Sequence, residues 1–265
     1  MRWPQATTWH DDRVEAVIFD LDDTLIVEEA AARSSVAEAL AAVGGVSAVN
    51  PVDIAMTCAR QLWQGSMSHQ ACLRLGIASW EGLWSTFEGC HDSLAGLADW
   101  APVYRDAAWA DSLAALGADP AQSPEVAQRY IDAQRRGHPL IPGAIEAVRL
   151  VGTTVRTGVL TNGPPDIQRL KLSQAGLDAL LDAVVISGET GFGKPEDAAF
   201  SLILDQLGVH ATDAIMVGDS WERDVRGSLN VGMQAVWVSH GRPPPEQRDE
   251  VLIVDELTSA VFEAL

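Results

Sequence analysis

The sequence predicts an α/β protein in which a parallel sheet carries helices on both faces and an all-helical segment is inserted after the first strand. Three observations lead to this class. Short apolar runs recur along the chain, helical patterns separate the later runs, and a long stretch without strand-like runs follows the first one. Parallel strands are covered on both faces, so they read as continuous apolar runs.

Each expected strand is followed by glycine, asparagine, aspartate or serine. The apolar runs are Val14 to Phe19, Thr154 to Leu160, Ala183 to Ile186, Ala214 to Val217 and Ala235 to Val238, with a last short strand at Val251 to Val254. Two helices alternate with them, at 166–177 and 196–207, each opened by proline and closed near a glycine. This alternation predicts an open, Rossmann-like sheet.

Residues 28–138 are predicted to form a separate helical cap domain, because Ala, Leu and Trp recur there at helical spacings. The core domain would then comprise residues 1–27 and 139–265. An insert that leaves after the first strand and returns before the second should lie above the carboxyl ends of the strands, where ligands bind in open α/β sheets. Its hinges are expected at 26–30 and 137–143, where the second contains Gly and Pro.

Composition narrows the class of function. A formal net charge of −19 disfavours nucleic acid and anionic membranes as partners, because both bind clustered Lys and Arg. The start of the chain has no apolar leader, and no run is long enough to span a bilayer, so we expect a cytoplasmic protein. Three widely spaced cysteines indicate reduced thiols rather than a disulfide framework. Only two lysines accompany sixteen arginines, which draws attention to Lys194.

The most informative motif follows the first expected strand. Asp20 and Asp22 end an apolar run, and alternate residues of an extended chain point the same way, so both carboxylates can face one centre. Neighbouring carboxylates repel each other and lose hydration, a cost usually borne where a cation or a reacting group uses them. The alternative interpretation is a solvated turn in which Asp23 or Thr24 caps a helix.

Polar groups also follow three other expected strands. They are Thr161, Asn162, Gly163, Lys194, Asp219 and Asp224. A hydroxyl, an amide and a flexible turn before a helix suit phosphate oxygens, and a lysine adds a point charge. Helix capping by Thr161 or Asn162, a solvated Lys194 and a capping aspartate are the structural alternatives. Gathered at one sheet edge, the carboxylates suit Mg²⁺, with Asp22 contributing its backbone carbonyl.

Two other sites, one for calcium and one for a nucleotide, are excluded by one or two residues each. An EF-hand loop beginning at Asp20 would have Leu25 where glycine is needed and Ala31 where a bidentate glutamate is needed. The segment 188–195 matches a phosphate-binding P-loop except at Pro195, which has no hydroxyl for Mg²⁺.

In this combination the sequence resembles the haloacid dehalogenase-like (HAD) superfamily of phosphatases. That family has Asp-x-Asp-x-Thr, then Thr or Ser after the second core strand, then Lys, then Gly-Asp with a further acid. Here these are the segments 20–24, 161–163, 194–195 and 218–219 with Asp224, in order over essentially the whole chain. The helical insert lies where members with a C1-type cap carry theirs. The segments 161–177 and 188–195 look most like the branch of N-acylneuraminate phosphatases and pyrimidine nucleotidases.

The resemblance implies Mg²⁺-dependent hydrolysis of a small phosphate monoester through an aspartyl-phosphate. Asp20 would attack phosphorus, while Asp22 would protonate the leaving group and later accept a proton from water. Thr161, Lys194 and the turn at Asn162 and Gly163 would hold phosphoryl oxygens. The implied metal site consists of Asp20, Asp22, Asp219 and Asp224. An acid such as Asp22 must be neutral when the ester binds, which predicts an acidic to neutral pH optimum.

Two other functions stay open at this point. A phosphomutase of the β-phosphoglucomutase type would use the same groups but return the phosphoryl group to a sugar. A catalytically idle HAD-like binding protein would keep the fold without the reaction. Asp22 argues against a dehalogenase, whose first motif lacks the second aspartate. The identity of the small phosphorylated metabolite and the oligomeric state are not set by the sequence.

Overall fold

Six parallel strands form one sheet in the order β3-β2-β1-β4-β5-β6. The structure is a computed structural model that describes residues 14–46, 48–246, 248 and 250–258. The strands are β1 (Ala16–Phe19), β2 (Arg156–Thr161), β3 (Ala183–Ile186), β4 (Ala214–Gly218), β5 (Gln234–Val238) and β6 (Val251–Val254). The predicted α/β class with a parallel, Rossmann-like sheet is confirmed, and strand ends differ from the expected ones by at most two residues.

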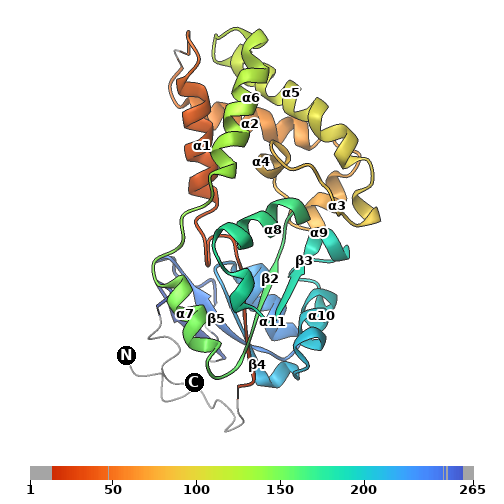
Figure 1. Ribbon diagram of the computed structural model, residues 1–265, viewed down its shortest axis with the longest axis vertical. Coiled ribbons are helices and arrows are strands. Elements are labelled where there is room, and N and C mark those ends of the chain that lie inside the picture. Colours follow the sequence, from red (N-terminus) through yellow and green to blue (C-terminus); the bar gives the residue numbers. More distant parts are fainter. Residues whose placement is uncertain (1–13, 47, 247, 249, 259–265) are drawn as a thin grey trace.

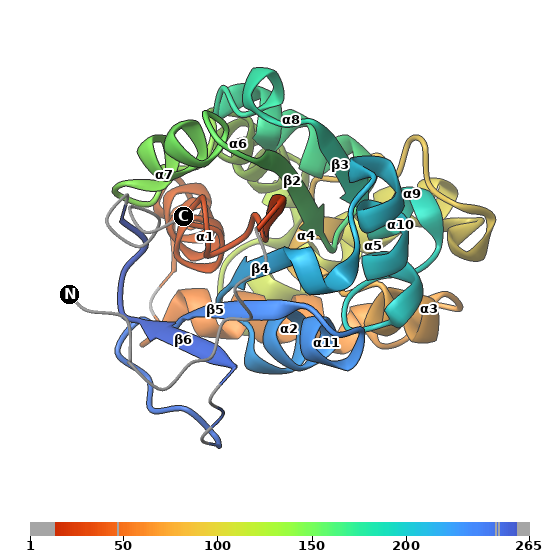
Figure 2. The ribbon, with the colours of Figure 1, turned by 90° about the horizontal axis from the view of Figure 1, so that it is seen from below.

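Helices cover both faces of the sheet (Figure 2). Val17 and Phe19 pack into one apolar cluster with α7 (Ala144–Val151) and α8 (Pro165–Gln174). Ala16 and Ile18 face the opposite way and pack against α10 (Asp197–Leu207), beside which lies α11 (Arg226–Asn230). This alternation explains why β1 is buried along its whole length.

Six helices form a separate layer over one end of the sheet, called here the helical layer (residues 29–135; Figure 1). They are α1 (Glu29–Ala41), α2 (Pro51–Trp63), α3 (His69–Arg74), α4 (Ser79–Gly82), α5 (Leu97–Ala115) and α6 (Ser123–Arg135), with short 3₁₀ turns η1 (Asp92–Leu94) and η2 (Pro120–Gln122). The remaining short elements lie in the sheet region: η3 (Asp178–Leu180), α9 (Ser187–Thr190), η4 (Ala211–Asp213) and a π-helical turn η5 (Trp221–Val225).

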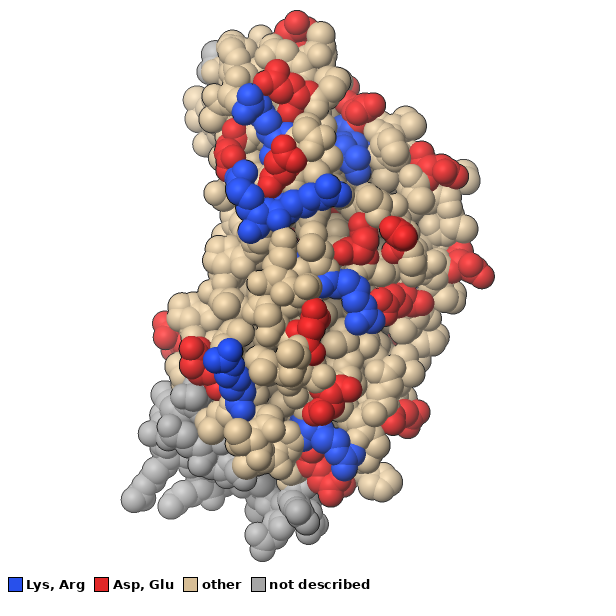
Figure 3. Space-filling model, viewed as in Figure 1, with Lys and Arg blue, Asp and Glu red and all other residues tan. Residues whose placement is uncertain are grey.

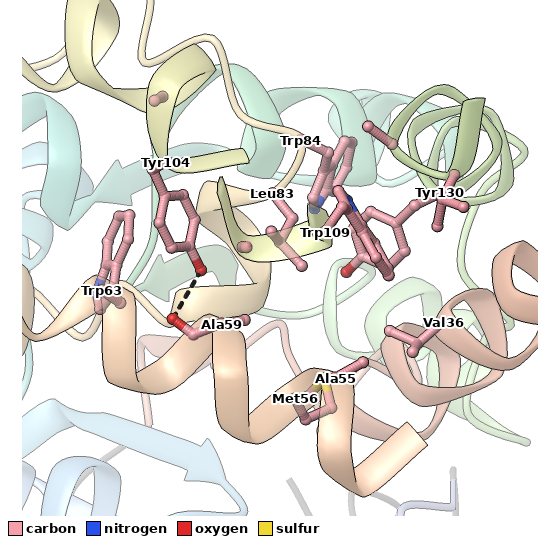
Figure 4. Packing of buried hydrophobic residues seen from close by; sticks show 14 of the residues in the cluster. Val36, Ala55, Met56, Ala59, Trp63, Leu83, Trp84, Tyr104, Trp109 and Tyr130 are labelled. Atoms are coloured by element: carbon pink, nitrogen blue, oxygen red, sulfur yellow. Dashed lines mark hydrogen bonds between the residues drawn. The ribbon is translucent and has the colours of Figure 1, made fainter. Parts of the chain in front are cut away.

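The helical layer has its own apolar core, which is rich in aromatic rings (Figure 4). Trp63 packs edge-on against Tyr104, with ring centroids 5.1 Å apart. The Tyr104 hydroxyl contacts the carbonyl oxygens of Ala59 at 3.2 Å and Ser79 at 2.8 Å. Its polar end is therefore satisfied inside the layer, as a buried tyrosine requires.

The two segments that connect the sheet to the helical layer lie side by side. The Val27 amide donates to the Pro139 carbonyl at 2.8 Å, and the Ile141 amide donates to the Leu25 carbonyl at 2.9 Å. The division into a core of 1–27 and 139–265 and a cap of 28–138 stays a prediction. Residues 1–13 and 259–265 of that predicted core lie outside the described residues.

The structure also bears on the expectations for the cysteines, for membrane-spanning segments and for the surface charge. Cys58, Cys72 and Cys90 are free thiols. Within the described ranges, no helix combines the length and apolarity needed to cross a bilayer. On the face shown in Figure 3, acidic and basic side chains are interspersed. The expected cytoplasmic location stays a prediction.

Candidate active site

A pocket of about 370 Å³ lies between the carboxyl ends of the central strands and the helical layer. Its wall on the sheet side includes Asp20, Asp22, Asn162, Lys194, Asp219 and Asp224. Its wall on the layer side comes from the α3–α4 region and includes Cys72, Leu73, Gly76, Ile77, Ala78, Trp80 and Glu81. Segments remote in sequence therefore meet at one chamber, because parallel strands present their carboxyl ends at the same edge.

Asp20, Lys194 and Asp224 form a buried ion-pair triad at the base of this pocket. The Lys194 Nζ lies 2.5 Å from an Asp20 carboxylate oxygen and 2.6 Å from an Asp224 oxygen. Burial alone would lower the pKa of Lys194, but the two carboxylates outweigh it and raise that pKa above its usual value. The ammonium is therefore fixed as a charge beside Asp20. A solvated surface role for Lys194 is excluded, since its side chain is 2% exposed.

Carboxylate oxygens of Asp20, Asp219 and Asp224 lie within 4.8 Å of one another. The π-helical turn η5 orients Asp224, whose other oxygen accepts a hydrogen bond from the Ser220 amide at 2.9 Å. A Cβ at Gly218 would lie 2.3 Å from the Asp224 carboxyl carbon, so this approach requires glycine. Burial raises the pKa of Asp219 to about 6, and the charge of Asp224 adds to the effect. Three hard oxygen donors at this spacing could hold a divalent cation.

The Asn162 side chain holds the backbone that carries Lys194. Its amide nitrogen donates to the Lys194 carbonyl at 2.9 Å, and its amide oxygen accepts from the Lys194 backbone amide at 2.9 Å. Helix α8 starts instead after Pro164, with no side-chain cap. The capping interpretation of Asn162 is therefore wrong, since both ends of its amide are engaged elsewhere.

Asp22 faces the pocket from a different direction. One carboxylate oxygen lies 3.0 Å from Lys171 Nζ, and the other accepts a hydrogen bond from Gln168 Nε2 at 3.0 Å. Burial raises the pKa of Asp22, although Lys171 opposes the shift. The neighbouring Asp23 accepts hydrogen bonds from the Glu28 and Glu29 amides at 2.9 and 3.4 Å. Asp23 therefore accepts from the two amides at the start of α1, although the N-cap residue is Glu28, and both Asp22 and Asp23 line the pocket.

Two predicted phosphate-binding residues lie just behind the pocket wall. The Thr161 side chain is fully buried, and its hydroxyl accepts a hydrogen bond from Gln168 at 2.6 Å. The Gly163 amide donates to the Ser187 hydroxyl at 3.0 Å. Neither Thr161 nor Gly163 lines the pocket in this arrangement, whereas Asn162 and Lys194 do.

Sequence reasoning missed four polar residues of this region, namely Lys171, Gln168, Glu28 and Glu81. Lys171 was recoverable, because it is the second of only two lysines and the scarcity that singled out Lys194 applies equally to it. Nothing in the sequence around the two glutamates indicated a functional role. Glu28 directly precedes the helical layer and Glu81 lies in α4, and only the tertiary fold brings both to Lys171, which also contacts Asp22.

Residues 14–232 match the haloacid dehalogenase-like hydrolase family. The chain belongs to this family. It is 34% identical over 260 residues to the phosphoserine phosphatase of Thermus thermophilus, which covers 95% of this chain and 100% of that protein. It is 42% identical over 92 residues to the N-acylneuraminate-9-phosphatase of Mus musculus, covering 34% of this chain and 37% of that protein.

The fold is shared with a solved HAD-hydrolase, YfnB from Bacillus subtilis, whose crystal structure was determined with magnesium bound. The TM-score is 0.64 at 20% identity, with 96% of this chain and 99% of that chain covered. The resemblance drawn from the four motifs is therefore confirmed at the level of the family, and the match to an N-acylneuraminate phosphatase agrees with the branch that the sequence suggested.

Proposed function

We propose that this HAD-like hydrolase is a phosphatase that hydrolyses a small phosphate monoester through an aspartyl-phosphate on Asp20. One observation carries the proposal. The Asp20 carboxylate lies against Lys194 and the acidic cluster, in the same pocket as a second carboxylate, Asp22, that is held by its own hydrogen bonds. A nucleophile, a charge for phosphoryl oxygens and an acid in one chamber are the groups that phosphoryl transfer needs.

We further propose Mg²⁺ as the cofactor, because the cluster offers oxygen donors only. Asp20, Asp219 and Asp224 would hold it with their side chains and Asp22 with its backbone carbonyl. When bound, the ion would offset the negative charge of carboxylate and phosphate and polarise the phosphoryl group.

The chain's own residues account for two steps. An Asp20 oxygen attacks phosphorus, the bond from phosphorus to the ester oxygen breaks, and Asp22 gives its proton to the departing oxygen. Water then attacks the same phosphorus and loses a proton to Asp22, so that Asp20 is released with inorganic phosphate. Lys194 neutralises phosphoryl oxygens in both steps, and Asn162 keeps Lys194 in place. Thr161 remains a proposed phosphate contact through its hydroxyl.

We propose that residues 28–138 act as a cap that closes the pocket. The layer already contacts the sheet side at several points, since the Ser187 hydroxyl donates to the Leu75 carbonyl at 2.7 Å and Asp166 accepts from Ser85 at 2.8 Å. Closure would keep bulk water out while the ester reacts.

The first ester to test is O-phosphoserine, the substrate that names the full-length relative from Thermus thermophilus. Besides the phosphate, the pocket suits the carboxylate and the ammonium group of this ester. Arg223 lines the wall and could pair with a carboxylate, while Glu29 could pair with an ammonium group. A lower KM for O-phosphoserine than for phosphoethanolamine, which lacks the carboxylate, is expected. Equal KM values would remove Arg223 from substrate recognition.

The test of the function itself is phosphate release from a panel of esters, with Mg²⁺ and with EDTA. We expect turnover that requires Mg²⁺ and is lost in Asp20→Asn. A phosphomutase would need a bisphosphate activator and release little phosphate, and an idle binding protein would turn over no ester. Either outcome refutes the phosphatase.

A further inference from the structure

Lys171 of α8 is fully buried and faces three carboxylates that come from three separate segments. Its Nζ lies 3.0 Å from Asp22 after β1, 2.8 Å from Glu28 at the entry to the helical layer, and 3.9 Å from Glu81 in α4. Burial of this ammonium would lower its pKa, but the three carboxylates outweigh burial and raise the pKa above its usual value. Lys171 is therefore a permanent charge at the junction of sheet and layer.

The same cluster includes groups on both connecting segments. Glu28 precedes α1, and its carboxylate contacts Nε2 of His138, which follows α6, at 3.0 Å. Trp80 donates to the other Glu28 oxygen at 3.3 Å. Burial would raise the pKa of Glu28, but Lys171 and His138 outweigh it and lower that pKa to about 2. Glu28 is thus the ionised partner that balances Lys171.

Because the Glu28 carboxylate already balances the positive charge of Lys171, Lys171 does not need Asp22 as a counter-ion. Asp22 is nevertheless held at both oxygens, by Lys171 at one and by Gln168 at the other, each at 3.0 Å. Lys171 and Gln168 are one turn apart on α8, so a single helix face fixes the orientation of this carboxylate. The Asp22 side chain keeps 22% exposure, toward the pocket that it lines.

We propose that Lys171 is a positioning residue for the proton-transfer step: it holds the Asp22 carboxylate in the pocket and ties it to the helical layer through Glu28 and Glu81. This inference rests on the proposed phosphatase function. It adds to that function a link between the two parts of the molecule, because proton transfer would be competent only while Glu28 of the connecting segment and Glu81 of the helical layer contact the same lysine.

Leaving groups of different basicity separate this role from a merely structural one. An alkyl phosphate needs a proton on its departing oxygen, whereas p-nitrophenolate leaves without one. Both esters need Asp22 as a base when water cleaves the aspartyl-phosphate. A misplaced Asp22 therefore slows the first step only for alkyl esters and slows the second step for both.

The experiment compares Lys171→Met with the wild-type protein and with Arg169→Met. Arg169 is the neighbouring cation on α8, pairs with Glu189 at 2.8 Å and is half exposed, so its loss serves as the matched control. For Lys171→Met we expect kcat on an alkyl phosphate to fall about 100-fold, in line with a lost proton transfer. With p-nitrophenyl phosphate we expect a burst of one p-nitrophenolate per enzyme, followed by slow turnover.

The outcomes are distinct. A fall of equal size for both esters without a burst, or no fall, overturns the positioning role. If Lys171→Met does not fold, the double variant Lys171→Met/Glu28→Gln removes the lysine together with the carboxylate that balances it, and the same burst is expected; its absence overturns the proposal. Wild-type and Arg169→Met proteins that release no phosphate from any ester refute the phosphatase function instead.

Discussion

Replacing Lys194 by Met removes the ammonium that lies 2.5 Å from Asp20 and 2.6 Å from Asp224. Both carboxylates are buried, and together with Asp219 they would then face each other with oxygens within 4.8 Å and no cation between them. Removing one partner of a buried ion pair costs about 3–5 kcal/mol. For a chain of this size that corresponds to a Tm lower by about 6–20 °C.

The assay is thermal unfolding of Lys194→Met and wild-type protein, in EDTA and in Mg²⁺. A divalent cation can replace the missing charge, so we expect Mg²⁺ to recover part of the lost Tm and to raise the Tm of the variant more than that of the wild type. The control is Lys194→Arg, which changes the side chain but keeps the positive charge. Equal Tm values in EDTA, or equal Mg²⁺ shifts, would refute the reasoning.

Three further outcomes are expected. First, the Mg²⁺ affinity measured by calorimetry should fall as the pH drops below about 6, because Asp219 has a pKa raised to about 6 and takes up a proton there, which weakens it as a metal ligand. An unchanged affinity at pH 5 contradicts this. Second, burial raises the pKa of Glu81 from 4.5 to about 8, so between these pH values the native state keeps a proton that the unfolded chain releases. The free energy of unfolding should therefore fall as the pH rises from 4.5 to 8, by at most about 1.4 kcal/mol per pH unit. Urea titrations should show a smaller pH dependence for Glu81→Gln. Third, Gly218→Ala places a Cβ against Asp224 and should weaken Mg²⁺ binding at least 10-fold in calorimetry. The control is Gly44→Ala, whose Cβ would meet no atom within 4 Å, and it should leave Mg²⁺ binding unchanged.

The fold was predictable because its signals are local. A strand buried on both faces must be a short apolar run, and β1, β2 and β4 each show one that ends in the polar residues of the pocket. The wall on the sheet side was predictable for the same reason, since parallel strands bring their carboxyl ends together whatever their separation in sequence. Asp20, Asn162 and Asp219 thus follow from strand ends alone, whereas Lys194 was indicated by the scarcity of lysine in the chain.

The wall on the layer side was not predictable, because its residues are placed by helix packing. Glu81 lies in a four-residue helix, and nothing in its neighbourhood in the sequence distinguishes it from a solvated glutamate. Its burial depends on the tertiary fold, which brings the Glu81 carboxyl group of α4 to within 3.9 Å of Lys171 in α8. Thr161 shows the opposite case: it lies at the carboxyl end of β2, close to where the sequence placed it, but its hydroxyl faces Gln168 rather than the pocket.

The paired connecting segments have a consequence for how such chains diversify. Val27 and Pro139 are joined by one backbone hydrogen bond, so the segment 28–138 leaves the sheet and returns to it at the same place. Within the described sheet, the strands pair with one another through residues outside this segment. The helices above the sheet can therefore be exchanged without breaking a strand pairing, as long as Glu28 and Glu81 are kept beside Lys171.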